Sequence, residues 1–427
     1  MAEGLRLRRP TPAEIGLIVA LLLFAALAGF TAVQTLRSGF VPTYDEANYE
    51  AMVKHWLASG VYGYYAPITG LPDATVTPGL PLLLVPFYAV WGAANAGGPY
   101  AAIFAMNIVF GLLALWGVWW LARDAAGGKA AVIAAIALAV YPTFFRLPAR
   151  VLTEVPSAAA FVLFLVAMTA ALRRSDLRLA LGAGACATLS VMVRPSFGPM
   201  VLVVLLWMWF SAKDRRGALR LAGASAGVLG VALALWVGSN ALTLHRLTLI
   251  ESRGEPVLAG IDPWYRESGG TYRYGPSYAR FVAEGKPVEA SQYAMTALAE
   301  HLRTDPARTV AWFTIGKTDY IFFRSAAAFG KTSLVVGSVW SVYHYVFMVL
   351  GFAGLALAVR FRPLVPLSLA FVVGWAGLLT LVPEARYAFG LLPLMAVAGA
   401  VLLVRAWGTR GAAGSADGDR PDEAPAR

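Results

Sequence analysis

The sequence predicts an all-α integral membrane protein with about ten membrane-spanning helices. Hydrophobic residues make up 59% of its 427 residues and charged residues only 14%, whereas soluble domains average about 25% charged residues. Apolar stretches of roughly 20 residues, the length that crosses the hydrocarbon core of a bilayer, recur along the chain. The basic residues, which give a net charge of +11, lie in short clusters between these stretches and not along one polar face, which excludes a nucleic-acid-binding protein.

The predicted spans follow in chain order. The first, 15–36, is interpreted as a retained anchor, because no small-residue cleavage site follows it between Phe30 and Tyr44. The others are about 99–121, 129–146, 152–172, 178–194, 196–212, 218–240, 333–359, 363–382 and 387–406. A further run, 78–94, is shorter and contains three prolines, and whether it crosses decides the sidedness of everything that follows.

The positive-inside rule settles the sidedness. If the N-terminal arginines are cytoplasmic and 78–94 lies in the interface without crossing, five basic clusters fall on the cytoplasmic side. These are Arg123/Lys129, Arg173/Arg174/Arg178, Lys213/Arg215/Arg216, Arg360/Arg362 and Arg405/Arg410. If 78–94 crossed, all five would lie outside. We therefore expect a plasma (inner) membrane protein with both termini in the cytoplasm.

We expect one transmembrane domain over residues 1–407, with two large outer loops at about 37–98 and 241–332. Helices are predicted around 288–303 and 305–324 of the second loop. The tail, 408–427, has no bulky apolar residue, which predicts disorder. The single cysteine, Cys186, lies in an apolar run, so the sequence contains neither a disulfide framework nor a Cys/His zinc motif.

Charged and polar residues collect at the predicted outer ends of the spans. The span interiors carry almost no ionisable residue, which argues against an ion-coupled transporter; the exception, His344, is interpreted as a hydrogen-bonded packing residue. The residues at the outer ends are Asp45, Glu46, Glu154, Arg194, His245, Arg246, Glu384, Arg386 and Tyr387. Such convergence at one membrane face is typical of a binding or catalytic pocket.

Asp45 and Glu46 begin a predicted amphipathic helix. Apolar side chains recur from Tyr49 onwards at intervals of three and four residues, which predicts a helix lying flat on the membrane. Thr43 and Glu46 also fit a capping box, and Asp45 would complement the helix dipole, so capping is the alternative interpretation of the pair. The other outer charges favour a site, because chemistry on a phosphate-linked substrate needs a general base and cationic partners.

The remaining outer charges have similar alternatives. Glu154 could be a first-turn acid ahead of Pro156, and Arg194 and Arg386 could be interface anchors. Arginine on the outer side runs against the positive-inside bias, however, so each is expected to have a dedicated partner. Bidentate phosphate recognition is the chemistry that suits arginine best.

These motifs, in this order, resemble the GT-C superfamily of membrane glycosyltransferases that use polyprenyl-phosphate sugars, such as protein O-mannosyltransferases, aminoarabinose transferases and lipopolysaccharide glycosyltransferases. The resemblance covers nearly the whole chain. Its motifs are Asp45-Glu46 with Tyr49, Thr77-Pro78-Gly79-Leu80-Pro81-Leu82, Thr153-Glu154-Val155-Pro156, Arg194-Pro195, Thr304-Asp305-Pro306-Ala307-Arg308 and Glu384-Ala385-Arg386-Tyr387. The fold it implies is a bundle of about ten transmembrane helices with two flat juxtamembrane helices in the first outer loop.

The resemblance implies an inverting transfer of a sugar from the lipid carrier to an acceptor hydroxyl of a lipid, glycan or protein at the extracytoplasmic face. Asp45 would be the general base, Glu46 its neighbour in positioning and Glu154 a second acid. The residues that would meet the lipid-linked phosphate or the sugar are Lys54, Arg194, His245, Glu384, Arg386 and Tyr387. The three acids could ligate Mg²⁺ or Mn²⁺ through oxygen, but no Asp-x-Asp triplet is present, and we expect a metal-independent reaction.

Two other functions fit part of the sequence. A transporter or flippase for a lipid-linked substrate would also use outer arginines, but the chain shows no internal repeat and few polar residues within its spans. An oligosaccharide ligase would also work on a polyprenyl carrier, but through a pyrophosphate leaving group. A structural subunit gives no reason for the outer charges.

Overall fold

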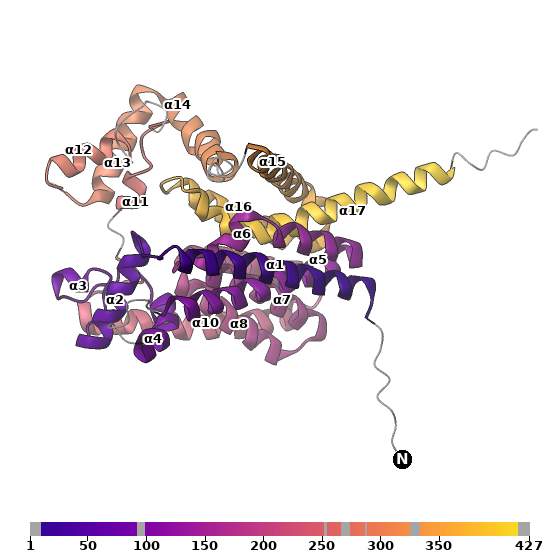
Figure 1. Ribbon diagram of the computed structural model, residues 1–427, viewed down its shortest axis with the longest axis horizontal. Coiled ribbons are helices and arrows are strands. Elements are labelled where there is room, and N and C mark those ends of the chain that lie inside the picture. The colour runs from indigo at the N-terminus through magenta and orange to yellow at the C-terminus, as the bar shows by residue number, and fades with distance from the viewer. Residues whose placement is uncertain are drawn as a thin grey trace, which may run out of the picture.

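The computed structural model describes residues 10–91, 99–251, 254–265, 274–286, 288–324 and 334–416, and every regular element in these ranges is a helix. Long helices pack side by side into a bundle (Figure 1). They are α1 (Pro12–Arg37), α5 (Tyr100–Ala139), α7 (Glu154–Arg174), α8 (Leu177–Val193), α9 (Gly198–Ser211), α10 (Arg215–Leu244), α15 (Leu334–Ala356), α16 (Val365–Leu379) and α17 (Leu392–Ala416). The predicted all-α class is confirmed.

Short helices connect the long ones. In the first outer loop lie α2 (Asp45–Ser59), α3 (Ala66–Thr69) and α4 (Gly79–Trp91), and in the second α11 (Glu255–Leu258), α12 (Pro276–Ala283), α13 (Ala290–Thr304) and α14 (Pro306–Ala311). The π-helical turns η3 (Trp312–Gly316) and η4 (Asp319–Phe323) continue from α14. The remaining short pieces are α6 (Pro142–Arg146), η1 (Leu147–Ala149), η2 (Pro195–Phe197), η6 (Leu357–Arg360), η7 (Arg362–Leu364) and η8 (Ala385–Leu391).

Within the described residues, seven helical segments are long and apolar enough to cross a membrane. They are Pro12–Arg37, Tyr100–Ala139, Glu154–Arg174, Arg215–Leu244, Gly337–Ala356, Arg362–Leu379 and Ala385–Trp407. Leu177–Val193 and Pro195–Ser211, which the sequence predicts as spans, are shorter apolar helices, as is Gly79–Trp91. The chain is therefore a multi-pass membrane protein, and the count of ten crossings stays a prediction.

The 40-residue α5 turns back on itself at Ala126 and Gly127, whose backbone is not helical; Gly127 has a φ of 82°. The ring of Phe24 in α1 faces Gly111, before the turn, and packs against Phe144, after it, with ring centroids 5.2 Å apart. In a straight helix Gly111 and Phe144 would lie about 50 Å apart. The two arms of α5 are therefore antiparallel, as the separate predicted spans 99–121 and 129–146 require.

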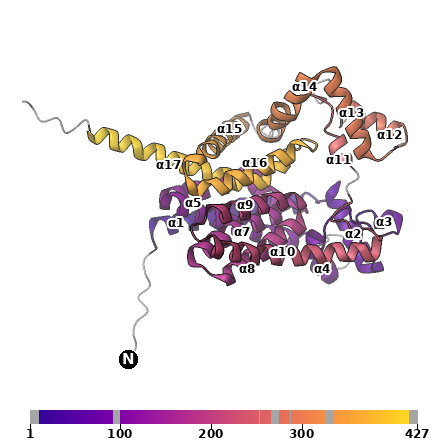
Figure 2. The same cartoon turned by 180° about the vertical axis from the view of Figure 1, so that it is seen from behind.

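The short helices of the two large loops, α2 to α4 and α11 to α14, gather at one end of the bundle, called here the loop end (Figures 1 and 2). Gly79, at the start of α4, faces the backbone of Val193 at the end of α8, and Lys54 of α2 lies 5.7 Å from the ring centroid of Tyr88, near the end of α4. Both ends of α4 thus lie at the loop end, and α4 does not traverse the bundle.

The basic clusters lie at the opposite end, called here the basic end. There Arg173 at the end of α7 pairs with Asp124 of α5, and Arg405 of α17 lies 4.0 Å from the ring centroid of Phe361. Helix α17 continues to Ala416, past residue 408, where the sequence predicts a disordered tail to begin. The rest of that predicted tail, 417–427, lies outside the described residues.

The loop between α10 and α15 folds into a helical layer that contacts the segment before η8. The carboxylate of Asp262 accepts hydrogen bonds from the Ser277 hydroxyl (2.6 Å) and pairs with His301 (2.9 Å), which joins α12 and α13. The layer reaches the bundle through the Pro256 carbonyl, which accepts the Val382 N–H at 2.8 Å, and through Lys317. This layer therefore fixes the segment that leads into Arg386.

Candidate active site

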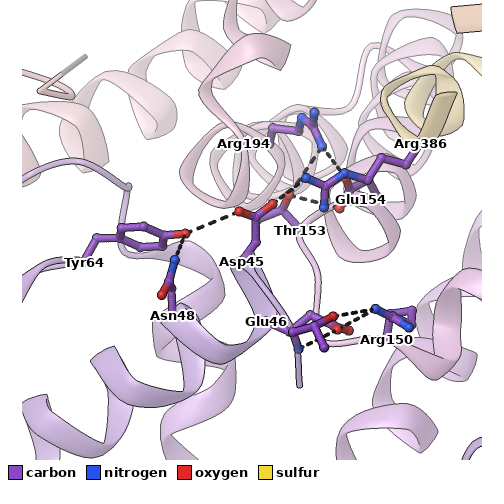
Figure 3. A network of polar contacts seen from close by, with 10 residues as sticks. Asp45, Glu46, Asn48, Tyr64, Arg150, Thr153, Glu154, Arg194 and Arg386 are labelled. Carbon is purple, nitrogen blue, oxygen red and sulfur yellow. Dashed lines mark hydrogen bonds and ion pairs between the residues drawn. The ribbon is translucent and has the colours of Figure 1, made fainter. Parts of the chain in front are cut away.

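Asp45 is the first residue of α2, and its side chain does not cap that helix. The N-cap is Tyr44, which has a φ of 51° and makes no side-chain capping bond, so Thr43 is not the N-cap of the alternative interpretation, although the Glu46 carboxylate accepts the Thr43 N–H at 3.4 Å. A non-glycine residue in this region is strained, and such strain is concentrated at functional sites. Asp45 instead forms an ion pair with Arg386 and accepts a long hydrogen bond, 3.5 Å, from the Tyr64 hydroxyl (Figure 3).

Glu154 lies between two arginines from different helices. Its carboxylate is buried and lies 3.1 Å from Nη1 of Arg194 and 3.9 Å from Nε of Arg386. Arg386 thus bridges Glu154 and Asp45 (Figure 3). The Thr153 hydroxyl adds a donor to Glu154 at 3.3 Å and accepts from Arg194 at 3.4 Å. The start of α7, the end of α8, the start of α2 and η8 all deliver charge to this cluster.

Aromatic rings hold the two arginines in place. The ring centroid of Tyr387 lies 4.9 Å from the guanidinium carbon of Arg194 and 5.4 Å from that of Arg386. Cation–π contacts of this kind favour a planar cation over the ring face. Arg386 also directs a guanidinium nitrogen at the carboxylate of Asp45, whose side chain is 40% exposed.

Tyrosines that the sequence analysis did not single out as site residues complete the cluster. Burial and the nearby charge of Asp45 raise the pKa of Tyr64 above its usual value, so the hydroxyl stays protonated and donates to Asp45. Asn48 orients it by donating to the Tyr64 oxygen at 2.9 Å. Tyr49, which the sequence places on an apolar helix face and in the Asp45-Glu46 motif, packs edge-on against Tyr64 with ring centroids 5.6 Å apart. The three tyrosines of the run Tyr62-Gly63-Tyr64-Tyr65, close to Asp45 in sequence, could have indicated an aromatic contribution to the site.

Glu46 lies outside the cluster, although it is adjacent to Asp45 in sequence. Its carboxylate, 1% exposed, accepts the Val151 backbone N–H at 3.0 Å and pairs with Arg150 at 2.7 Å. Figure 3 shows this pair as a separate group on the other face of α2. Glu46 therefore anchors α2 to the segment before Glu154.

The structure places three further predicted site residues as follows. Lys54 pairs with Glu50 four residues earlier and lies over Tyr88. His245 is exposed and ends α10 in the left-handed conformation, with a φ of 56°. Glu384 is the N-cap of η8, and its carbonyl accepts the Tyr387 N–H at 3.0 Å, so it shapes the turn that presents Arg386 and Tyr387.

The acids as placed do not fit a divalent cation. Over the ranges that the structure describes, no three His, Cys, Asp or Glu side chains converge on a point that could hold a metal. Asp45 and Glu154 are directed at Arg386 and Arg194, and Glu46 is held elsewhere by Arg150. We derive no step through Mg²⁺ or Mn²⁺.

Comparisons with known proteins agree with this architecture. Residues 72–239 match the family model of dolichyl-phosphate-mannose-protein mannosyltransferase. A search of curated protein sequences gave no match. The apo oligosaccharyltransferase of Archaeoglobus fulgidus is similar in structure, with a TM-score of 0.58 and 16% identity over 97% of this chain and 53% of that one.

The oligosaccharyltransferase AglB of the same organism, in complex with an inhibitory peptide and a dolichol-phosphate, gives a TM-score of 0.56 and 15% identity over 97% of this chain and 52% of that one. A match to ArnT of Cupriavidus metallidurans bound to undecaprenyl phosphate covers 95% of this chain and 81% of the ArnT chain at 17% identity. Its TM-score of 0.40 is too low to carry a conclusion.

The chain spans about half the length of the oligosaccharyltransferase structures that it matches. At this level of identity the likeness concerns the fold, which is shared over almost all of the chain. The chain therefore has the fold of the GT-C membrane glycosyltransferases, the superfamily that its sequence resembles.

Proposed function

We propose that this chain is an inverting glycosyltransferase that moves a sugar from a polyprenyl-phosphate carrier to an acceptor hydroxyl at the extracytoplasmic face of the membrane. The observation that carries the proposal is the cluster itself: a half-exposed carboxylate, Asp45, beside two arginines that share the buried Glu154. It combines a general base with cations for a phosphate at one end of a membrane bundle.

The reaction follows from these roles. The acceptor oxygen attacks the anomeric carbon while its proton passes to the Asp45 carboxylate, and the bond from that carbon to the phosphate oxygen breaks. The polyprenyl phosphate leaves with the electron pair, and Arg194 and Arg386 stabilise its negative charge. A bound donor phosphate competes with Asp45 for Arg386, so donor binding frees the carboxylate to accept the proton.

Glu154 has a positioning role in this scheme. It is buried and contacts both arginines, so it holds their guanidinium groups side by side. Tyr387 supports the same arginines through its ring. The partners of the enzyme are then the lipid-linked donor and a lipid, glycan or protein acceptor, and the catalytic domain is residues 1–407 with both termini cytoplasmic.

The test is transfer of radiolabelled sugar from polyprenyl-phosphate donors by membranes that contain the wild type, Asp45→Asn or Glu154→Gln. We expect Asp45→Asn to lose activity by about 100-fold or more, because a general base is removed at nearly constant shape. Glu300→Gln, on the exposed face of α13, removes an acid of the loop end outside the cluster and should retain activity. Gel filtration of tagged protein shows whether each variant folds. Equal activity of wild type and folded Asp45→Asn would contradict the base assignment.

The shared fold with an oligosaccharyltransferase favours a second candidate, transfer of an oligosaccharide from a pyrophosphate carrier. The same membranes separate the two. Transfer from polyprenyl-monophosphate sugars supports the first proposal, whereas transfer only from lipid-linked pyrophosphate oligosaccharides supports the second.

A further inference from the structure

Two adjoining cavities lie at the basic end of the bundle, away from the active site. One has a volume of about 590 Å³ and the other about 550 Å³. They share a wall made of Leu172, Arg173, Met208 and Ser211, from the ends of α7 and α9. Because Glu154 begins α7 and Arg173 is near its end, the cavities are separated from Glu154 by almost the whole helix, about 30 Å.

The rims of the cavities are basic. Arg362 lines the first cavity, and Lys213 and Arg220 line the second. All three side chains are exposed, and none has an acidic partner within the described residues. The two acids of the lining are already engaged: Asp124 pairs with Arg173, and Asp214 accepts the Gly217 N–H at 3.0 Å as N-cap of α10. An anionic group can therefore bind here with an excess of cations.

The interior of the first cavity is apolar. Its walls include Leu121, Trp207, Phe210, Leu364 and Leu367, and the Phe210 side chain is 59% exposed at the bundle surface. A site with a cationic rim and a hydrocarbon wall that opens at the end of a membrane bundle matches a phospholipid, with the phosphate at the rim and an acyl chain along the wall. A soluble phosphate would gain nothing from the apolar wall.

We propose that these two cavities bind anionic phospholipids of the leaflet at the basic end, with a headgroup phosphate at each basic rim: Arg362 in the first cavity, and Lys213 and Arg220 in the second. The site is independent of the transfer reaction at the loop end. The bound lipid contacts α7, α9, α10 and α16 at the end of the bundle opposite the active site, and these contacts stabilise the packing of the four helices.

The test uses native mass spectrometry of the purified full chain, titrated with phosphatidylglycerol, phosphatidylcholine or soluble glycerol phosphate. We expect phosphatidylglycerol to bind more tightly than phosphatidylcholine, and Lys213→Gln/Arg220→Gln/Arg362→Gln to weaken its binding by about fivefold per removed cation. The matched control is Arg174→Gln/Arg178→Gln/Arg216→Gln, which removes three exposed cations of the same end that do not line the cavities.

Three outcomes would overturn the proposal. Equal binding of both phospholipids means that no anionic site exists, and tight binding of glycerol phosphate means that the ligand is a soluble phosphate. Equal weakening in the two triple variants means that general surface charge, and not these cavities, attracts the lipid. Since none of the six cations has an ion-pair partner in the part of the chain that the structure describes, gel filtration should show that both variants fold.

Discussion

Asp45 and Glu46 show how two neighbouring acids acquire different roles. Successive residues of a helix point about 100° apart, so Asp45 is directed at Arg386 while Glu46 is directed at the 150–151 segment. The sequence alone groups them, because both fit a capping motif and both could act on a substrate. Only the packing of α2 against the rest of the protein distinguishes Asp45, the proposed base, from Glu46, which anchors the helix.

Replacing Glu46 with alanine should destabilise the protein by about 1–3 kcal/mol, because the buried Val151 N–H loses its acceptor. Thermal unfolding in detergent measures this loss. Glu46→Gln keeps an acceptor oxygen for Val151 and should lose less. If Glu46→Ala unfolds like wild type yet transfers no sugar, Glu46 acts in the chemistry and the anchoring role is wrong.

The sequence pointed to the acids and arginines of the cluster because ionisable residues are rare inside the apolar spans and collect at their predicted outer ends. It could not show that Arg386 is shared by Asp45 and Glu154, since residues 45 and 386 are brought together only by the fold. Lys54 and His245 were grouped with the site for their charge alone, and the structure places them elsewhere. Tyr64 was missed because an aromatic residue in a loop has many uses.

At the scale of elements, the contact between α4 and α8 positions Arg194. A Cβ on Gly79 would lie 2.4 Å from the backbone nitrogen of Val193, so α8 could not end where it does. Gly79→Ala should cost about 1–3 kcal/mol through overpacking and reduce transfer. Gly182→Ala, with no atom within 4 Å of the added Cβ, should be neutral or stabilise by up to about 1 kcal/mol. Equal unfolding temperatures for the two variants would show that this contact yields easily.

The buried Lys317 makes the stability of the outer layer depend on pH. Burial lowers its pKa from 10.5 to about 7, and its ammonium donates to the Leu381 carbonyl at 2.9 Å. Between pH 7 and 10.5 the unfolded chain binds more protons than the folded one at this residue, so stability should rise with pH there, by at most about 1.4 kcal/mol per unit.

Unfolding temperatures in detergent at pH 7, 8 and 9 measure the effect. Lys317→Met, which keeps the apolar stem without the amine, should flatten the rise. A wild type whose stability is constant from pH 7 to 9, or a variant with the same slope, would show that Lys317 is not deprotonated by folding.

Elements were predicted well where hydrophobic runs are long. The apolar runs matched helices α1, α7 and α10 closely, and the turn within α5 falls between the predicted spans 99–121 and 129–146. The predicted helices at 288–303 and 305–324 correspond to α13 and to α14 with η3 and η4. The π-helical turns were not foreseen, because they depend on packing around Trp312 and Lys317 and leave no pattern in the sequence.

At the scale of the molecule, the separation of the loop end from the basic end predicts which positions face which side. The chain has one cysteine, Cys186, so Cys186→Ser gives a background for single-cysteine labelling. With an impermeant maleimide on intact cells, Ile68→Cys and Leu247→Cys should react, since both positions are highly exposed at the loop end. Arg178→Cys and Arg216→Cys should react only after permeabilisation. The reverse pattern would place the active site in the cytoplasm.

Which side of the membrane each end faces stays a prediction from the basic clusters, but the long helices were predictable because apolar length sets the candidate spans. The placement of the loop between α10 and α15 next to the start of η8 could not be predicted, because it depends on a few backbone contacts such as that of Val382 with Pro256. Such backbone contacts leave no pattern in the hydropathy of the sequence.

The hairpin of α7 and α8 sets the relative position of Glu154 and Arg194. Glu154 is the first residue of α7 (21 residues) and Arg194 directly follows the last residue of α8 (17 residues), and the two side chains pair at 3.1 Å, so the hairpin returns the chain to the level at which it left. A residue inserted within either arm would advance one partner by about 1.5 Å and rotate it by about 100°, which breaks the phase between them. A residue inserted at the turn, between Ser175 and Asp176, changes neither phase nor height at the far end. Tolerance of insertions should therefore be greatest at the point of the hairpin most distant from the chemistry.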